Sequence, residues 1–149
     1  MSLQEEVMTA MKTAMKEKDQ MALSALRAVK SEILLAQTET GSKEELTKEQ
    51  EIKILSKLVK QRKDSAAIYA QQNRNDLAEP ELAQAEIISQ FLPAQLGEAE
   101  IEKIVLETIS KVGASGMKDM GKVMGIVNQQ LAGKADGKTI ASIVKTKLT

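Results

Sequence analysis

The stretch Met117–Leu131, MKDMGKVMGIVNQQL, decides the fold class of this 149-residue chain. Its apolar residues recur at steps of three and four, the period of an amphipathic α-helix. Good helix formers dominate the whole chain, only two prolines interrupt them, and no strand pattern is evident. The sequence therefore predicts an all-α protein whose helices bury one apolar face each. In this stretch the face comprises Met117, Met120, Met124, Val127 and Leu131.

Four helices are predicted before residue 93. Ser2 with Glu5 and Thr47 with Gln50 have the spacing of capping boxes, which mark helix starts. A loop is predicted over Thr38–Lys43, where glycine and serine interrupt the helical pattern. The apolar positions that we expect in the first, second and fourth helices are Leu3, Val7, Met11, Met15, Ala22, Leu26, Val29, Ile33, Leu82, Ile87, Ile88 and Phe91.

A domain boundary is predicted at Pro93–Gly97. The residue before a proline disfavours helix, and Gly97 can cap the helix that follows. We therefore expect a larger N-terminal helical domain of residues 1–92, a linker of residues 93–97, and a smaller C-terminal three-helix domain of residues 98–149. Gly113 and Gly133 end the first two helices of that smaller domain, and Asp136 caps the third.

The residue types that are absent exclude several kinds of chemistry. Without His or Cys the chain has no thiol nucleophile, no imidazole base and no zinc site of the usual sulfur and nitrogen type. A cysteine-free chain is also typical of a reducing cytoplasm. The longest apolar run, Ala66–Ala70, is far shorter than the roughly 20 residues of a membrane helix, and the acidic N-terminus does not resemble a secretory signal. We expect a cytoplasmic protein with no membrane contact, no metal, no cofactor and no catalytic residues.

Charge is balanced over the chain but not along it. The 21 basic residues equal the 21 acidic ones. Residues 1–110 hold 14 basic and 19 acidic side chains, whereas residues 111–149 hold 7 Lys against Asp119 and Asp136. Because nucleic-acid affinity depends on phosphate contacts with basic residues, the C-terminal part is the candidate for such a partner.

Glycines and lysines alternate in the most unusual stretch of the chain. Gly121 and Gly125 lie four apart inside a predicted helix, where each costs about 1 kcal/mol relative to Ala. They would let another backbone approach closely, which could be a packed helix or a sugar–phosphate chain. Two further lysines lie at a predicted helix N-terminus, whose N–H groups suit a phosphate. The predicted RNA-backbone site comprises Lys118, Gly121, Lys122, Gly125, Lys134 and Lys138.

A second basic face is predicted on the third helix. It comprises Lys53, Lys57, Lys60, Arg62 and Lys63, with no acidic residue inside the span. The face could contact nucleic acid, but a solvated helix surface explains it equally well.

Five segments resemble a known family. Met117–Gly125 and Gly133–Gly137 resemble the C-terminal domain shared by the YqeY family and the GatB subunit of tRNA-dependent amidotransferases. Leu26–Ser31, Val59–Ser65 and Phe91–Leu96 resemble the N-terminal half of stand-alone YqeY-like proteins. The resemblance covers essentially the whole chain. It implies two helical domains, the smaller of which contacts tRNA through the six residues of the predicted RNA-backbone site.

These observations predict a non-catalytic, tRNA-binding accessory protein. Tyr69 and Phe91 are its only aromatic rings, so recognition of shape and phosphates is expected rather than base stacking. The alternative is a helical adaptor for an amidotransferase or an aminoacyl-tRNA synthetase. A third function, carbon–nitrogen ligation with glutamine as amido donor, follows from family labels alone, because the chain shows no glutaminase or amidase site. The oligomeric state stays open.

Overall fold

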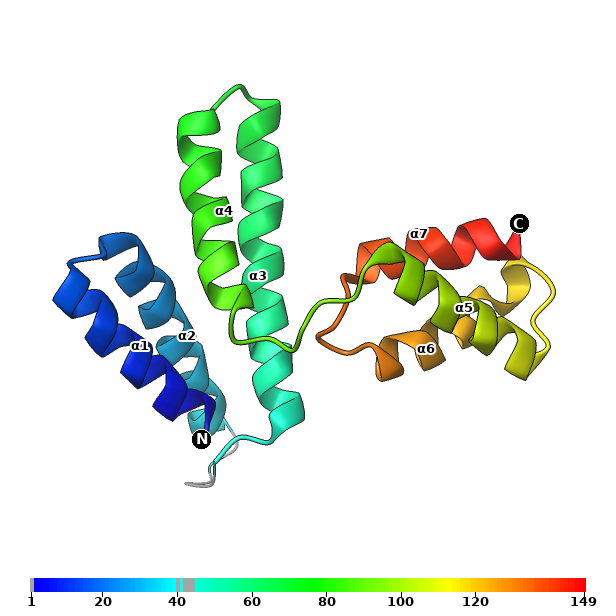
Figure 1. The fold of residues 1–149 in the computed structure, drawn as a ribbon, viewed down its shortest axis with the longest axis horizontal. Helices are drawn as coiled ribbons and strands as arrows, with labels where there is room; N and C mark the ends of the chain where they lie inside the picture. The colour runs from blue at the N-terminus through cyan, green and yellow to red at the C-terminus, as the bar shows by residue number, and fades with distance from the viewer. Residues whose placement is uncertain (1, 40, 42–44) are drawn as a thin grey trace. The chain divides into compact units, whose positions relative to one another are not determined.

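The computed structural model describes residues 2–39, 41 and 45–149 of the protein. These residues form α-helices, one short 3-10 helix (η1) and no strand, so the predicted all-α class is confirmed for the described chain (Figure 1). In chain order the elements are α1 (Leu3–Glu17), α2 (Gln20–Glu39), α3 (Lys48–Gln71), α4 (Asn75–Ser89), α5 (Glu98–Val112), η1 (Met117–Asp119), α6 (Met120–Gln130) and α7 (Gly137–Leu148).

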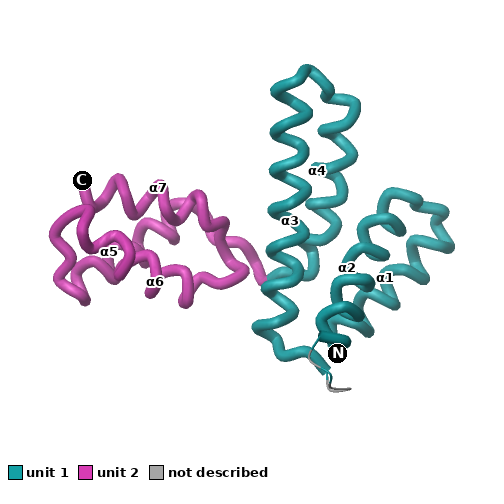
Figure 2. Tube along the Cα trace, turned by 180° about the vertical axis from the view of Figure 1, so that it is seen from behind, with its two compact units in different colours: residues 1–92 teal, residues 93–149 magenta. Residues whose placement is uncertain are grey.

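Contacts within the chain divide it into two compact units, residues 1–92 and residues 93–149 (Figure 2). That each unit is an independent domain stays a prediction. Residues 93–97, the expected linker, begin the second unit. There the backbone N–H of Leu96 donates to the carbonyl oxygen of Lys134 at 2.8 Å, and the side-chain amide of Gln95 donates to that of Gly133 at 2.7 Å. Gln95 and Leu96 are therefore attached to the loop that follows α6.

The first unit is built from two helical hairpins. α1 packs along α2, α3 packs along α4, and α2 contacts both helices of the second hairpin (Figure 1). Both predicted capping boxes are present. The Ser2 hydroxyl accepts from the Glu5 N–H while the Glu5 carboxylate accepts from the Ser2 N–H, and Thr47 and Gln50 do the same at the start of α3. These bonds satisfy two N–H groups that a helix start leaves without partners.

Most of the apolar positions predicted for this unit are buried, and three expectations were wrong. Met15 and Leu82 are 57% and 51% exposed. In the last turn of α1 the buried position belongs to Ala14, one residue and about 100° around the helix from Met15. Phe91 packs on the core but lies beyond α4, which ends at Ser89.

The loop predicted over Thr38–Lys43 falls mostly outside the described residues. Thr38 itself lies in the last turn of α2, where its hydroxyl donates to the carbonyl oxygen of Leu34 at 2.8 Å.

The second unit packs α5, α6 and α7 around a core of branched aliphatic side chains. Val105, Val123, Val127 and Val144 are fully buried at its centre. Met120 and Met124 pack against this core as predicted, but Met117 is 44% exposed. The reason is that α6 begins at Met120, so Met117 lies in η1 and off the buried face.

Candidate nucleic-acid interface

The outer face of α6 carries Gly121 and Gly125, and the space above both is open. A Cβ atom built on either glycine meets nothing within 4 Å. Helix packing within the described chain therefore does not account for these two glycines. The α6 backbone is left accessible to another molecule on this face, at the expense of intrinsic helix stability.

Exposed lysines flank this glycine strip. Lys118 lies in η1 and Lys122 in the first turn of α6, and neither forms an ion pair with another described residue. Asp119, the acid between them, is held elsewhere, because its carboxylate accepts from the backbone N–H of Ser115 at 3.0 Å. Both ammonium groups are thus available to an external anion.

Two amide side chains extend the same face. Asn128 and Gln129 are exposed one turn beyond Gly125, where they can offer hydrogen-bond donors and acceptors. The sequence-based prediction missed them because it weighed only glycines and charges. Their spacing of three and four from Gly125 was the signal that could have found them. We call Lys118, Gly121, Lys122, Gly125, Asn128 and Gln129 the α6 face.

The six predicted RNA-contacting residues fall into two groups. Lys118, Gly121, Lys122 and Gly125 lie together on the α6 face, whereas Lys134 and Lys138 follow the far end of α6. The 11 residues of α6 span about 16 Å, at 1.5 Å per residue. Contact with both groups therefore requires a ligand with several nucleotides rather than one phosphate.

The start of α7 already carries a negative charge. The carboxylate of Asp136 accepts from the backbone N–H of Lys138 at 3.1 Å, which caps the helix as predicted. A phosphate bound to the same N–H groups would meet this carboxylate. The geometry therefore weakens the expectation of a phosphate at this helix end, while Lys134 remains exposed in the preceding loop.

The second basic face, on α3, is partly neutralised. The Lys60 ammonium pairs with the Asp64 carboxylate at 3.0 Å. Arg62 is half-buried and links α3 to α4, because its Nε donates to the Gln84 side chain at 3.0 Å and its Nη1 to the carbonyl oxygen of Leu58 at 3.3 Å. Lys53, Lys57 and Lys63 stay exposed.

The charge asymmetry depends on where the chain is divided. Residue 110 lies inside α5, so the division used for the sequence splits a helix. The second unit as a whole holds eight Lys against six acidic residues, four of which lie on α5. From Gly113 onward there are six Lys against two Asp. Positive charge is therefore concentrated on η1, α6, α7 and the loops between them.

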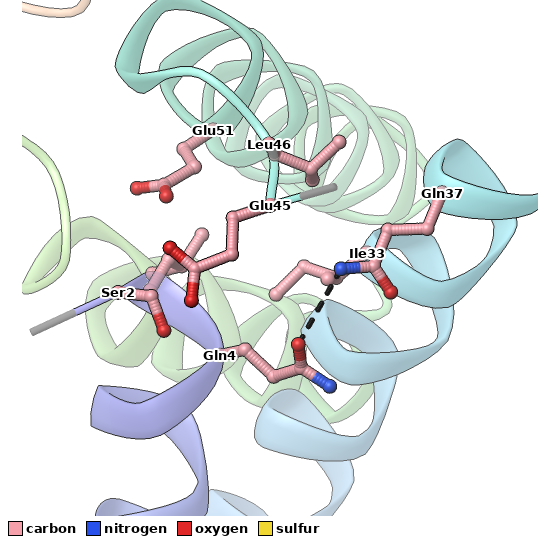
Figure 3. Close-up of a pocket in the computed structure, with 8 residues that line it drawn as sticks. Ser2, Gln4, Ile33, Gln37, Glu45, Leu46 and Glu51 are labelled. Carbon is pink, nitrogen blue, oxygen red and sulfur yellow. Dashed lines mark hydrogen bonds between the residues drawn. The ribbon is translucent and has the colours of Figure 1, made fainter. Parts of the chain in front are cut away.

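The first unit has a very small pocket between the start of α1, the end of α2 and the segment before α3. Figure 3 shows Gln4 and Gln37, whose side-chain amides are hydrogen-bonded at 3.4 Å, beside Glu45 and Glu51. Its volume of about 10 Å³ is the space of one water molecule. This pocket therefore cannot hold a substrate.

Two searches over the described residues found nothing. No three acidic side chains there converge as a group that could hold a metal ion. Among the same residues, no helix is both long and apolar enough to cross a membrane.

Comparison with known proteins gives two kinds of relative. "Altered inheritance of mitochondria protein 41, mitochondrial" of Meyerozyma guilliermondii is 34% identical over 122 residues, which cover 80% of this chain and 63% of that protein. The chain thus spans less than two thirds of this relative. The corresponding protein of Clavispora lusitaniae is 32% identical over 126 residues, 82% of this chain and 72% of that protein. Since both names include a mitochondrial location, the cytoplasm stays a prediction for this chain.

The second kind of relative is much longer than this chain. A glutamyl-tRNA(Gln) amidotransferase subunit of Methanococcus maripaludis is 47% identical over 51 residues, which are 34% of this chain and 8% of that protein. The similarity to a subunit of tRNA-dependent amidotransferases, expected from the sequence, is therefore confirmed over part of the chain. A sequence model of the Yqey-like protein family matches residues 4–148, so this chain belongs to that family.

Proposed function

We propose that this protein is a non-catalytic tRNA-binding accessory protein that holds the RNA backbone on the α6 face. The observation that carries the proposal is the open space above Gly121 and Gly125, flanked by Lys118 and Lys122. A strip without side chains lets ribose and phosphate approach the helix, and the two lysines neutralise phosphates and release their counterions.

Two observations support a folded tRNA as the ligand. The name of the amidotransferase relative includes glutamyl-tRNA(Gln). The second unit contains no aromatic ring, because Tyr69 and Phe91 both lie in the first unit. Single-strand binding proteins usually stack bases on such rings, so their absence favours contacts to backbone and shape.

A titration of the full chain with folded tRNA at several salt concentrations tests the proposal. The logarithm of affinity should fall linearly with the logarithm of salt concentration. A Lys118→Glu plus Lys122→Glu variant should bind about tenfold or more weakly, with a salt slope smaller by about two. The matched control is Lys53→Glu plus Lys57→Glu on α3, which makes the same charge change at the same spacing on an exposed helix.

The control should change the affinity by no more than about threefold, since partly neutralised α3 is not expected to contact RNA. The proposal fails if the wild-type chain does not bind tRNA at low salt. It also fails if the two double variants weaken binding equally.

A second candidate function is that of an adaptor for an amidotransferase or an aminoacyl-tRNA synthetase. It is favoured by the position of exposed apolar side chains, because seven of the nine large ones among the described residues lie in the first unit. An adaptor would co-purify with such a protein, and charge reversal on the α6 face would not disrupt that complex.

A further inference from the structure

A cavity of about 270 Å³ lies between α5 and α6, which pack side by side in the second unit (Figure 1). Its lining combines an apolar floor with a polar rim. Val112 and Ile126 supply aliphatic surface, and Glu107, Lys111 and Gln130 supply polar groups. The volume is slightly below the range of about 300–1,000 Å³ for drug-sized ligands, so a single planar ring system is the size that suits it.

The polar groups of the rim are available to a ligand. Glu107, Lys111 and Gln130 are exposed, and their side chains bond no other described residue. Thr108, the sixth lining residue, is buried, and its hydroxyl already donates to the carbonyl oxygen of Ile104 at 2.9 Å. Thr108 therefore contributes shape to the wall, while a carboxylate, an ammonium and an amide remain free to read the edge of a ring.

The cavity adjoins the α6 face. Lys122, Ile126 and Gln130 follow one another at steps of four, so they form a continuous row along α6. The next row around the helix is Gly121, Gly125 and Gln129, which belongs to the α6 face. A nucleotide whose phosphate lies near Lys122 can therefore direct its base toward Ile126 and Gln130.

We propose that the α5–α6 cavity receives one unstacked nucleobase that bears an exocyclic amino group, from an RNA bound to the α6 face. The proposal rests on the proposed function. Val112 and Ile126 contact the ring faces, as apolar side chains do around extruded bases. The Gln130 amide pairs with a donor and an acceptor of the base edge, and Glu107 accepts from the amino group. Nearby positive charge on η1 and α6 favours a nucleotide over an apolar side chain of a protein.

Two short RNA duplexes test this inference with the full chain. One is fully paired, and the other is identical except for a single bulged adenosine. The wild-type protein should bind the bulged duplex about tenfold more tightly at the same salt concentration. A bulged uridine, which has no exocyclic amino group, should give a smaller gain.

Gln130→Leu should abolish the preference for the bulged adenosine while leaving the salt slope unchanged, because no phosphate contact is removed. Glu107→Gln is the second variant, and it should reduce the preference without adding apolar surface. Gln61→Leu on exposed α3 is the matched control and should bind both duplexes as the wild type does. Circular dichroism checks that each variant is folded.

The outcomes separate this inference from the proposed function. If neither duplex nor tRNA binds, the proposed RNA-binding function is wrong. If RNA binds but bulged and paired duplexes bind equally, the α6 face holds RNA and the cavity takes no base, so only this inference is overturned. A bulge preference that survives both Gln130→Leu and Glu107→Gln also overturns it, because the base then lies elsewhere.

Discussion

Helices α3 and α6 both present lysines at helical spacing, but the surroundings of those lysines differ. On α3, Lys60 is paired with Asp64 and Arg62 bonds to α4. On α6, Lys118 and Lys122 have no ion pair with a described residue, and the glycines between and beside them have open space above. The comparison teaches that lysine spacing alone does not identify a nucleic-acid interface. Neighbouring acceptors and accessible backbone decide which basic face can receive a phosphate.

The largest expected effect concerns Arg62. Arg62→Ala should lower the free energy of unfolding by about 2 kcal/mol, because a half-buried guanidinium loses its bonds to Gln84 and Leu58. Affinity for tRNA should stay unchanged. Lys63→Ala, an exposed neighbour, should stay within about 0.5 kcal/mol of the wild type. Chemical denaturation and tRNA titration measure both quantities, and weaker tRNA binding at unchanged stability would show that α3 is an RNA face after all.

The glycines of α6 should show the opposite relation between stability and binding. Gly121→Ala plus Gly125→Ala should raise the free energy of unfolding by about 1–2 kcal/mol, because Ala favours the helix and its methyl groups meet open space. The same variant should bind tRNA severalfold more weakly. Gly113→Ala is the control, since Gly113 has φ +65°, and it should destabilise by about 1 kcal/mol. Unchanged tRNA affinity in the α6 variant would remove the functional reason for these glycines.

Asp136 tests whether the start of α7 belongs to the interface. Asp136→Ala should cost about 1 kcal/mol of stability because the cap bond to Lys138 N is lost. Asp136→Asn keeps an acceptor and removes the charge, so stability should be kept and tRNA affinity should change by no more than about twofold. A large gain in affinity would instead place a phosphate at this helix end.

The smallest expected effect lies at the turn between α3 and α4. A hydrogen bond from Arg74 lowers the pKa of Asp76 below its ordinary value of 3.8. Because the folded-state pKa is lowered, the pair stabilises the fold above pH 3.8, and this contribution is lost as the pH falls through the lowered pKa. Asp76→Asn should therefore be slightly less stable than the wild type at neutral pH and equal to it in strong acid. Both groups are exposed, so denaturation curves that show a large difference would contradict this prediction.

Local patterns predicted the secondary structure well because the signals are local. Capping boxes at Ser2 and Thr47 place helix starts, since the capping atoms lie within three residues of each other. Errors arose where burial depends on a neighbour. Met15 follows the period of its stripe but lies outward, because Ala14 faces the core in the last turn of α1.

The candidate site was only partly predictable. Spacing identified the lysines and glycines of the α6 face, but Glu107 and Gln130 lie on different helices, and only the packing of α5 against α6 brings them to one cavity. For the same reason the sequence did not show that Arg62 bonds to Gln84, 22 residues further along the chain.

The sequence by itself determined the all-α class, because helical periodicity is a short-range property of the chain. The absence of His and Cys likewise excludes thiol and imidazole chemistry whatever the fold. Only the tertiary structure decided that the glycines of α6 face open space, that Arg62 is used between helices, and that a cavity lies beside Lys122. These three properties depend on which atoms surround a side chain, and packing between distant segments sets those surroundings.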